Sequence, residues 1–250
     1  RLAASDGGAA SGRWAPDGDS VYFLSSRGGS NQVWRADRDG QAATQVTTLP
    51  VDVTAFRLSG DGRTLIVALP VFLDCADLDC TRDRLKAQAA PGSTVRGYDR
   101  LPLRPWDSWN DGRRSHLFAL TLNVSGLAAG TPRDLMSGLG GDTPSRPLGG
   151  DRAFALSPGG ARLVFQTQTQ GRTEALTNNT DVWMVPVAGG APVNLTQANT
   201  APDSNPTFSP DGRRLAWLAG RRENVYGDQP VLMIVDADGS NPRPIAADWD

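Results

Sequence analysis

One four-residue turn signature occurs four times in this chain. It reads APDG at 15–18, SGDG at 59–62, SPGG at 157–160 and SPDG at 209–212, and an apolar run follows each copy within a few residues. Proline presets φ at the second turn position, and glycine adopts a positive φ at no steric cost, so the next strand can reverse and pair with the one before it. A turn that leads into a strand and recurs every few tens of residues is typical of a β-propeller.

The spacing of the turns predicts four blades and one long insertion. The third turn residues stand at positions 17, 61, 159 and 211, which are 44, 98 and 52 residues apart. Because a bare blade needs roughly 40 to 50 residues, the 98-residue interval carries extra chain. We expect an all-β propeller with four-stranded antiparallel blades at about 10–50, 51–140, 150–197 and 203–247, and an insertion at 72–115 with a short helix around 81–88.

Four blades are few for a closed propeller. The expected fourth blade ends near residue 247, where a fifth blade would begin. We therefore expect these blades to belong to a larger propeller within a longer polypeptide. Incomplete closure leaves a blade face and strand edges open, so self-association is a further expectation.

Composition excludes several classes of partner. The formal net charge is −2 with acidic and basic residues interspersed, which argues against a nucleic-acid surface. No apolar stretch approaches the roughly 18 residues that span a bilayer, so we expect no membrane contact. The first five residues lack the layout of a signal peptide. The chain is thus expected either to be cytosolic or to have a signal upstream of residue 1.

The two cysteines help to decide between a cytosolic and an exported protein. Cys75 and Cys80 lie five residues apart, and the single histidine of the chain, His116, is far away in sequence. Zinc needs about four nitrogen or sulfur ligands, and a redox pair would usually be Cys-x-x-Cys. A local disulfide fits best and favours a periplasmic or secreted protein, although two free surface thiols are also compatible with the pattern.

The sequence contains little that indicates catalysis, and no cofactor or metal is expected. It lacks the Gly-x-Ser-x-Gly elbow of α/β-hydrolases, and a Ser-His-Asp triad would have to use His116, which starts an expected strand and is interpreted as structural. No glycine-rich phosphate loop precedes a helix. Asp74, Asp77 and Asp79 resemble a calcium loop only superficially, because the glycine and the terminal glutamate of an EF-hand are missing.

The best candidates for binding lie in loops, where a rigid scaffold usually carries its function. Aromatic and arginine side chains dominate recognition surfaces, and the insertion combines both types near its end: Trp106, Trp109, Arg113 and Arg114. The alternative is that both tryptophans pack the insertion onto its blade.

Two glutamates form the second candidate. Glu174 and Glu223 lie in equivalent loops of successive blades, which emerge on the same face of a propeller. Together they are candidates to hold a cation such as a peptide α-amino group. The alternative is that each forms a surface pair with a nearby arginine, which would contribute little.

These residues bring out a family resemblance. The Ser-Pro-Asp-Gly blades, the DCADLDCT segment at 74–81 and the run WDSWNDGRRSHLF at 106–118 resemble the N-terminal propeller of bacterial prolyl-oligopeptidase-family serine peptidases. The likeness is to the dipeptidyl-peptidase and acylaminoacyl-peptidase branch, and it spans essentially the whole chain. The turn repeat alone is weak, since Tol-system propellers share it.

The resemblance implies a propeller of seven or eight blades and a C-terminal α/β-hydrolase domain that carries the catalytic serine, aspartate and histidine. That domain is not in this chain, so no catalytic residue is carried over. In the family the propeller restricts access to short peptides and helps to position their N-termini, in some members through glutamates. Glu174 and Glu223 are counterparts of these by position only.

Two hypotheses follow. The first is the non-catalytic propeller part of a periplasmic or secreted serine exopeptidase, which gates and orients short peptides for a hydrolase domain of the same polypeptide. The second is a stand-alone binding or scaffold propeller of the Tol type. The insertion favours the first, because a pure scaffold has little need of an aromatic loop held by a disulfide. Under either hypothesis this chain alone is expected to hydrolyse nothing.

Overall fold

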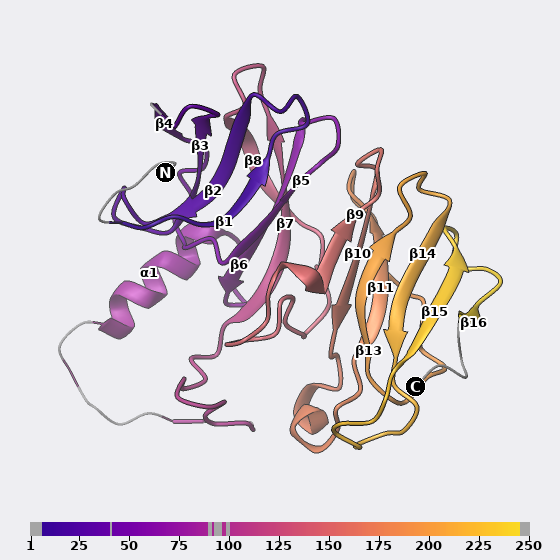
Figure 1. The fold of residues 1–250 in the computed structure, drawn as a ribbon. Coiled ribbons are helices and arrows are strands. Elements are labelled where there is room, and N and C mark those ends of the chain that lie inside the picture. Colours follow the sequence, from indigo (N-terminus) through magenta and orange to yellow (C-terminus); the bar gives the residue numbers. More distant parts are fainter. Residues whose placement is uncertain (1–6, 41, 90–91, 93–96, 99–100, 246–250) are drawn as a thin grey trace.

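A computed structural model describes residues 7–40, 42–89, 92, 97–98 and 101–245, and these residues form four separate four-stranded antiparallel sheets (Figure 1). In chain order, the strands are β1 (Ala10–Trp14), β2 (Ser20–Ser25), β3 (Gln32–Asp37) and β4 (Ala43–Gln45); β5 (Ala55–Leu58), β6 (Thr64–Val71), β7 (Arg114–Leu122) and β8 (Ala128–Asp134); β9 (Phe154–Leu156), β10 (Arg162–Thr167), β11 (Asp181–Pro186) and β12 (Val193–Asn194); and β13 (Asp203–Phe208), β14 (Arg214–Ala219), β15 (Val231–Asp236) and β16 (Arg243–Ile245).

Each sheet is one blade, and its strands pair in sequence order. The first strands of consecutive blades contact one another, β1 with β5, β5 with β9 and β9 with β13, so the blades fan out from this inner row. The fold class expected from the repeat is confirmed: the chain is an all-β propeller of four-stranded blades, and the second blade carries the long insertion.

The repeated turns behave as their residues predict. The last glycine of each has a positive φ, between 68° and 74°, and donates its N–H to the carbonyl of the first turn residue; these are Gly18, Gly62, Gly160 and Gly212. The second blade departs from the pattern with Gly60 where the three other turns have proline. A Cβ at Gly60 would lie 2.7 Å from the carbonyl oxygen of Pro158 in the next blade. The close approach of the two turns therefore explains why this position is glycine.

The core consists of apolar layers between neighbouring blades. Along β6, Leu65 and Val67 pack against the first blade, whereas Ile66 and Ala68 pack against the third. Successive side chains of a strand point to opposite faces, and both faces of this sheet are covered. Because side chains on both faces of β6 are buried, every position of the strand favours an apolar residue, and β6 is a continuous apolar run.

The insertion leaves the sheet after β6 and returns at β7. It contains the helix α1 (Leu78–Ala89), close to the predicted position, and a disulfide between Cys75 and Cys80. Arg114, which the sequence placed in the insertion, is the first residue of β7. Parts of the insertion between 90 and 100, and the expected end of the fourth blade at 247, lie outside the described residues.

Candidate functional site

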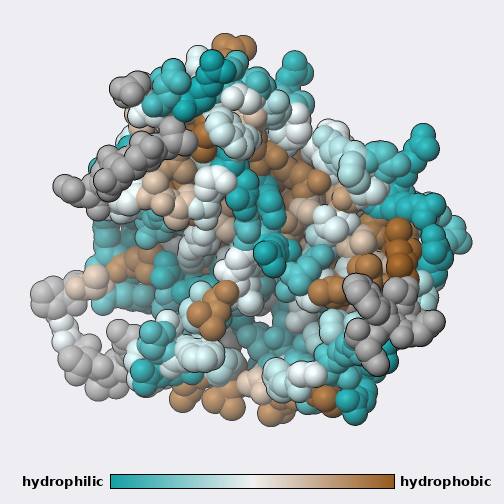
Figure 2. Space-filling model, viewed as in Figure 1, coloured by the Kyte–Doolittle hydropathy of each residue, from teal (hydrophilic) through white to brown (hydrophobic). Residues whose placement is uncertain are grey.

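A cavity of about 530 Å³ opens at one end of the second, third and fourth blades. Four segments line it: residues 102–114 of the insertion, the connection 142–147, the end of β10 with the following loop to residue 180, and the fourth-blade loop through Tyr226. The loop after β10 contains the short helix η2 (Gly171–Leu176). These loops lie along the lower edge of the molecule in Figure 1, and the same edge is hollowed and carries apolar patches in Figure 2.

A buried charge cluster forms one wall. The guanidinium of Arg114 donates two hydrogen bonds of 2.8 Å to the two carboxylate oxygens of Glu174 and a third of 2.8 Å to Asp142. Asp142 also accepts the N–H of Ser115, at 2.6 Å. Burial alone would lower the pKa of Arg114, but the two carboxylates outweigh it and raise that pKa above its ordinary value. The cluster therefore holds one positive and two negative charges, a net −1.

A second charge cluster lies beside the first. Asp111 accepts hydrogen bonds from both Arg113 and Arg146. Burial raises the pKa of Asp111, but the two arginines outweigh burial and bring it down to about 2. Arg146 also donates to the carbonyl of Arg113, at 2.9 Å. This cluster fixes the return of the insertion to the blade.

The two candidate tryptophans have different surroundings. Trp109 lines the cavity and stacks on Tyr98, with 5.8 Å between the two ring centroids. The guanidinium carbon of Arg104 lies over the Trp109 ring, 5.4 Å from the centroid of that ring. Trp106 is 80% exposed, has a positive φ of 54° and does not line the cavity. Positive φ is uncommon for a large side chain. Of the pair, only Trp109 faces the cavity.

The two candidate glutamates lie on neighbouring loops but in different environments. Glu174 belongs to the cavity wall and bonds to Arg114, which lies 60 positions away, rather than to an arginine near it in sequence. Glu223 is exposed and outside the cavity lining. Its neighbour Asn224 is clamped to Asn178, since the backbone N–H of each donates to the side-chain oxygen of the other, at 2.8 and 3.0 Å. The clamp holds the fourth-blade loop against the third blade.

Sequence reasoning missed several lining residues. Asp142, Arg146 and Tyr226 all lie in connections between strands, and no motif marks them. One signal in the sequence could have pointed to the connection that holds Asp142 and Arg146: residues 142–147 are all polar or proline. The sequence therefore identified Trp109, Arg113, Arg114 and Glu174 as candidates. It did not identify the pairing of Arg114 with Glu174 or the further partners Asp142 and Arg146.

His116 lies outside this cavity. It is 1% exposed, and its Nδ1 lies 3.0 Å from Asp134. Within the described part of the chain, no three His, Cys, Asp or Glu side chains are grouped to hold a metal ion. The same residues contain no helix long and apolar enough to cross a membrane.

No family model matches the sequence. A sequence relative, dipeptidyl-peptidase 5 of Porphyromonas endodontalis, is 27% identical over 240 residues, which cover 94% of this chain and 33% of that protein. The chain thus spans about a third of the length of the curated relatives that it matches over most of its own length.

Solved structures share the fold. An acylaminoacyl peptidase in complex with Z-Gly-Gly-Phe-chloromethyl ketone superposes with a TM-score of 0.62 at 15% identity, covering 97% of this chain and 32% of that one. The β-propeller domain of the Trilobed protease from Pyrococcus furiosus gives 0.54 at 12% identity, covering 97% and 57%. TolB from Acinetobacter baumannii gives 0.52 at 13% identity, covering 96% and 44%. These likenesses confirm the fold, and they do not separate a peptidase propeller from a Tol-type one.

Proposed function

Because this chain is homologous to the propeller part of dipeptidyl-peptidase-5-type peptidases, we propose that it is the non-catalytic portion of a serine exopeptidase. In this proposal it gates and orients short peptides for a hydrolase domain of the same polypeptide. The observation that carries the proposal is the cavity between three blades, with the Arg114–Glu174–Asp142 cluster and the Trp109 ring in its wall.

The charge of the cluster suggests which end of the peptide it receives. Glu174 and Asp142 together outweigh Arg114 by one negative charge, and a peptide α-ammonium that contacts these carboxylates would bring this cluster to zero, whereas the neighbouring cluster of Asp111, Arg113 and Arg146 has a net charge of +1. The side chains of Glu174, Asp142 and Arg114 are at most 16% exposed, and hydrogen bonds between charged groups are stronger where water is excluded. The ring of Trp109 offers an apolar surface for the peptide's first side chains.

A periplasmic or secreted location is part of the proposal. The Cys75–Cys80 disulfide supports it, because disulfides persist mainly in oxidising compartments.

The proposal is tested by calorimetric titration of the chain with trialanine and with N-acetyl-trialanine. We expect the free amine to bind about 10- to 100-fold more tightly, which corresponds to one charged hydrogen bond. Glu174→Gln should remove that preference, because it leaves the cluster neutral. Glu223→Gln is the matched control outside the cavity lining and should keep the preference; a loss of preference there as well would mean that the preference does not come from the Arg114–Glu174–Asp142 cluster.

If neither peptide binds, the peptide-orienting role is wrong and a Tol-type binding propeller is the remaining candidate. The hydrolase part of the proposal has its own test. The full-length product of the native gene should react with a fluorophosphonate serine-hydrolase probe, whereas this chain alone should not. An unlabelled full-length product would refute the peptidase assignment.

A further inference from the structure

A second cavity lies apart from the one described above and shares no lining residue with it. Its volume is about 750 Å³, within the range of small-molecule sites. It is an open cavity lined by the connection 48–50 between the first two blades, the segment 71–81 at the end of β6 and the start of the insertion, strands β7 and β8, and the turn 137–140. The proposed peptide site does not use it.

The walls of this cavity are apolar and polar in equal parts, and the polar part includes the carboxylates of Asp77, Asp79 and Asp134. The large apolar side chains that line it are Leu49, Pro50, Val71, Phe72, Leu73, Leu78, Phe118, Leu120, Pro132 and Leu139. These side chains favour the apolar body of a ligand, because burying it removes apolar surface from water.

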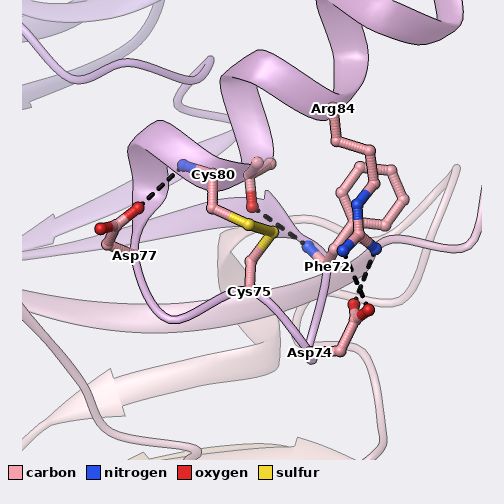
Figure 3. Close-up of a disulfide and its surroundings, with 7 residues drawn as sticks. Phe72, Asp74, Cys75, Asp77, Cys80 and Arg84 are labelled. Atoms are coloured by element: carbon pink, nitrogen blue, oxygen red, sulfur yellow. Dashed lines mark hydrogen bonds and ion pairs between the residues drawn. A yellow bond between two sulfur atoms is a disulfide. The ribbon is translucent and has the colours of Figure 1, made fainter.

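One wall is held rigidly by the start of the insertion (Figure 3). The Cys75–Cys80 disulfide closes the loop that leads into α1. Asp77 accepts the N–H of Cys80, at 2.8 Å, and so caps the helix. The guanidinium of Arg84 lies 4.6 Å from the ring centroid of Phe72 and forms two hydrogen bonds to Asp74. This part of the cavity is therefore preformed, which lowers the entropic cost of binding.

The cavity wall also contains one buried polar atom with an unused hydrogen-bonding capacity. His116 lines the cavity and is 1% exposed, and its Nε2 has no hydrogen-bond partner among the described residues. Its Nδ1 is 3.0 Å from the carboxylate of Asp134. Because an ionised carboxylate only accepts hydrogen bonds, Nδ1 carries the proton. In the neutral ring, Nε2 is then an acceptor that lacks a donor.

The first blade shows what this position looks like when it is satisfied internally. Gln32 and His116 occupy equivalent positions in the third strands of their blades. The residue after Gln32 is Val33, whose carbonyl accepts the N–H of Val46. The residue after His116 is Leu117, whose carbonyl accepts the N–H of Leu135 in the same way. The Gln32 amide donates to two backbone carbonyls of the following connection. In the second blade Nε2 of His116 has no partner among the described residues, as is true of Oδ1 of Asp181 at the same position of the third blade; of these two residues, only His116 lines this cavity. A buried polar group without a partner is costly, so a ligand that supplies the missing donor gains affinity.

We propose that this cavity binds a neutral molecule with an apolar body and one hydroxyl group, whose O–H donates to Nε2 of His116 while the body packs against the apolar side chains of the lining. Phenols and apolar alcohols have this chemistry. His116 is a recognition group in this site, oriented by Asp134, and no covalent step is involved. The inference is independent of the peptide-orienting role.

The test uses 4-butylphenol and its methyl ether, 4-butylanisole, which has the same apolar body but no donor. Titration of the full chain should give about 3- to 10-fold tighter binding of the phenol, the effect of one neutral hydrogen bond. Because His116 is the only histidine, its side-chain ¹⁵N resonances are assigned without ambiguity. The phenol should shift the Nε2 resonance upfield, as expected for an acceptor that gains a donor, and the ether should not.

Two variants separate recognition from folding. His116→Asn keeps an amide N–H for Asp134 but lacks Nε2, so it should bind phenol and ether equally while its thermal unfolding stays cooperative. Cys75→Ser with Cys80→Ser loosens the wall and should weaken both compounds alike. Equal binding of the two compounds by the unmodified chain, no binding of either, or phenol binding that leaves the Nε2 resonance unmoved would each overturn the proposal.

Discussion

Replacing Asp203 with asparagine should change how the stability of this chain depends on pH. Asp203 begins β13 and is fully buried. One carboxylate oxygen accepts hydrogen bonds from Trp217 and Asn199, and the other has no partner among the described residues. Burial raises the pKa of Asp203 from its ordinary 3.8 to about 6; hydrogen bonds oppose the rise and the nearby charge of Asp181 adds to it.

The sign follows from proton binding. A native pKa above the unfolded one means that the folded chain holds this proton more tightly, so the resulting stabilisation is complete below about pH 3.8 and is lost as the pH rises through 6. One pH unit of difference between the two pKa values corresponds to about 1.4 kcal/mol, so the full change amounts to about 3 kcal/mol. The asparagine variant keeps an oxygen that can accept from Trp217 and has no proton to lose.

The assay is urea unfolding, followed by circular dichroism, of the parent and the variant between pH 4 and pH 7.5. The free energy of unfolding of Asp203→Asn, minus that of the parent, should rise by about 2.4 kcal/mol across this interval, because the unfolded carboxyl is already partly ionised at pH 4. Asp211→Asn is the matched control in the same blade. A hydrogen bond from Ser209 lowers the pKa of Asp211, so its contribution to stability changes mainly below pH 4 and its difference should stay nearly constant across this interval. A difference for Asp203→Asn that stays constant with pH would refute the burial argument.

Three further predictions concern stability and are tested by chemical or thermal unfolding. Arg114→Leu should cost about 3 kcal/mol, because it leaves two carboxylates facing each other in a poorly solvated site; a loss below 1 kcal/mol would contradict the burial of this pair. Cys75→Ser with Cys80→Ser should cost about 2 kcal/mol, the value expected for closing so short a loop, and reduction of the parent should reproduce it. Gly60→Ala should destabilise the chain because its Cβ would meet the carbonyl of Pro158 at 2.7 Å, whereas an unchanged midpoint would show that the two turns separate freely.

The blades could be predicted from the sequence because the forces that specify them are local. These turns favour proline and aspartate at their central positions and have glycine at the last position in all four copies. A strand buried on one or both faces needs side chains with a period of two or a continuous apolar run. The disulfide was also predictable, since Cys75 and Cys80 have no other sulfur or imidazole near them in sequence, and five residues separate them. The helix that follows was expected within a few residues of its position.

The contacts within the candidate sites were not predictable, because they join residues far apart in the chain. The sequence placed arginines of the insertion and Glu174 among the candidates, but not the bond between Arg114 and Glu174 across 60 positions, nor the third member, Asp142. Each of these residues is of a type that is common in ordinary loops. Their pairing follows from the arrangement of two blades and from low solvent exposure, which makes an unpaired charge costly.

His116 illustrates the same division. The sequence identified it as the only histidine and as a structural residue at the start of a strand, and its hydrogen bond to Asp134 agrees with such a role. Only the tertiary structure shows that His116 lines a cavity and that its Nε2 is buried without a hydrogen-bond partner among the described residues. The sequence by itself determined the repeated strands and turns of this propeller, because local chemistry specifies them. The tertiary structure decided which charges meet and which polar atoms remain unpaired, because those depend on how the blades and the insertion pack.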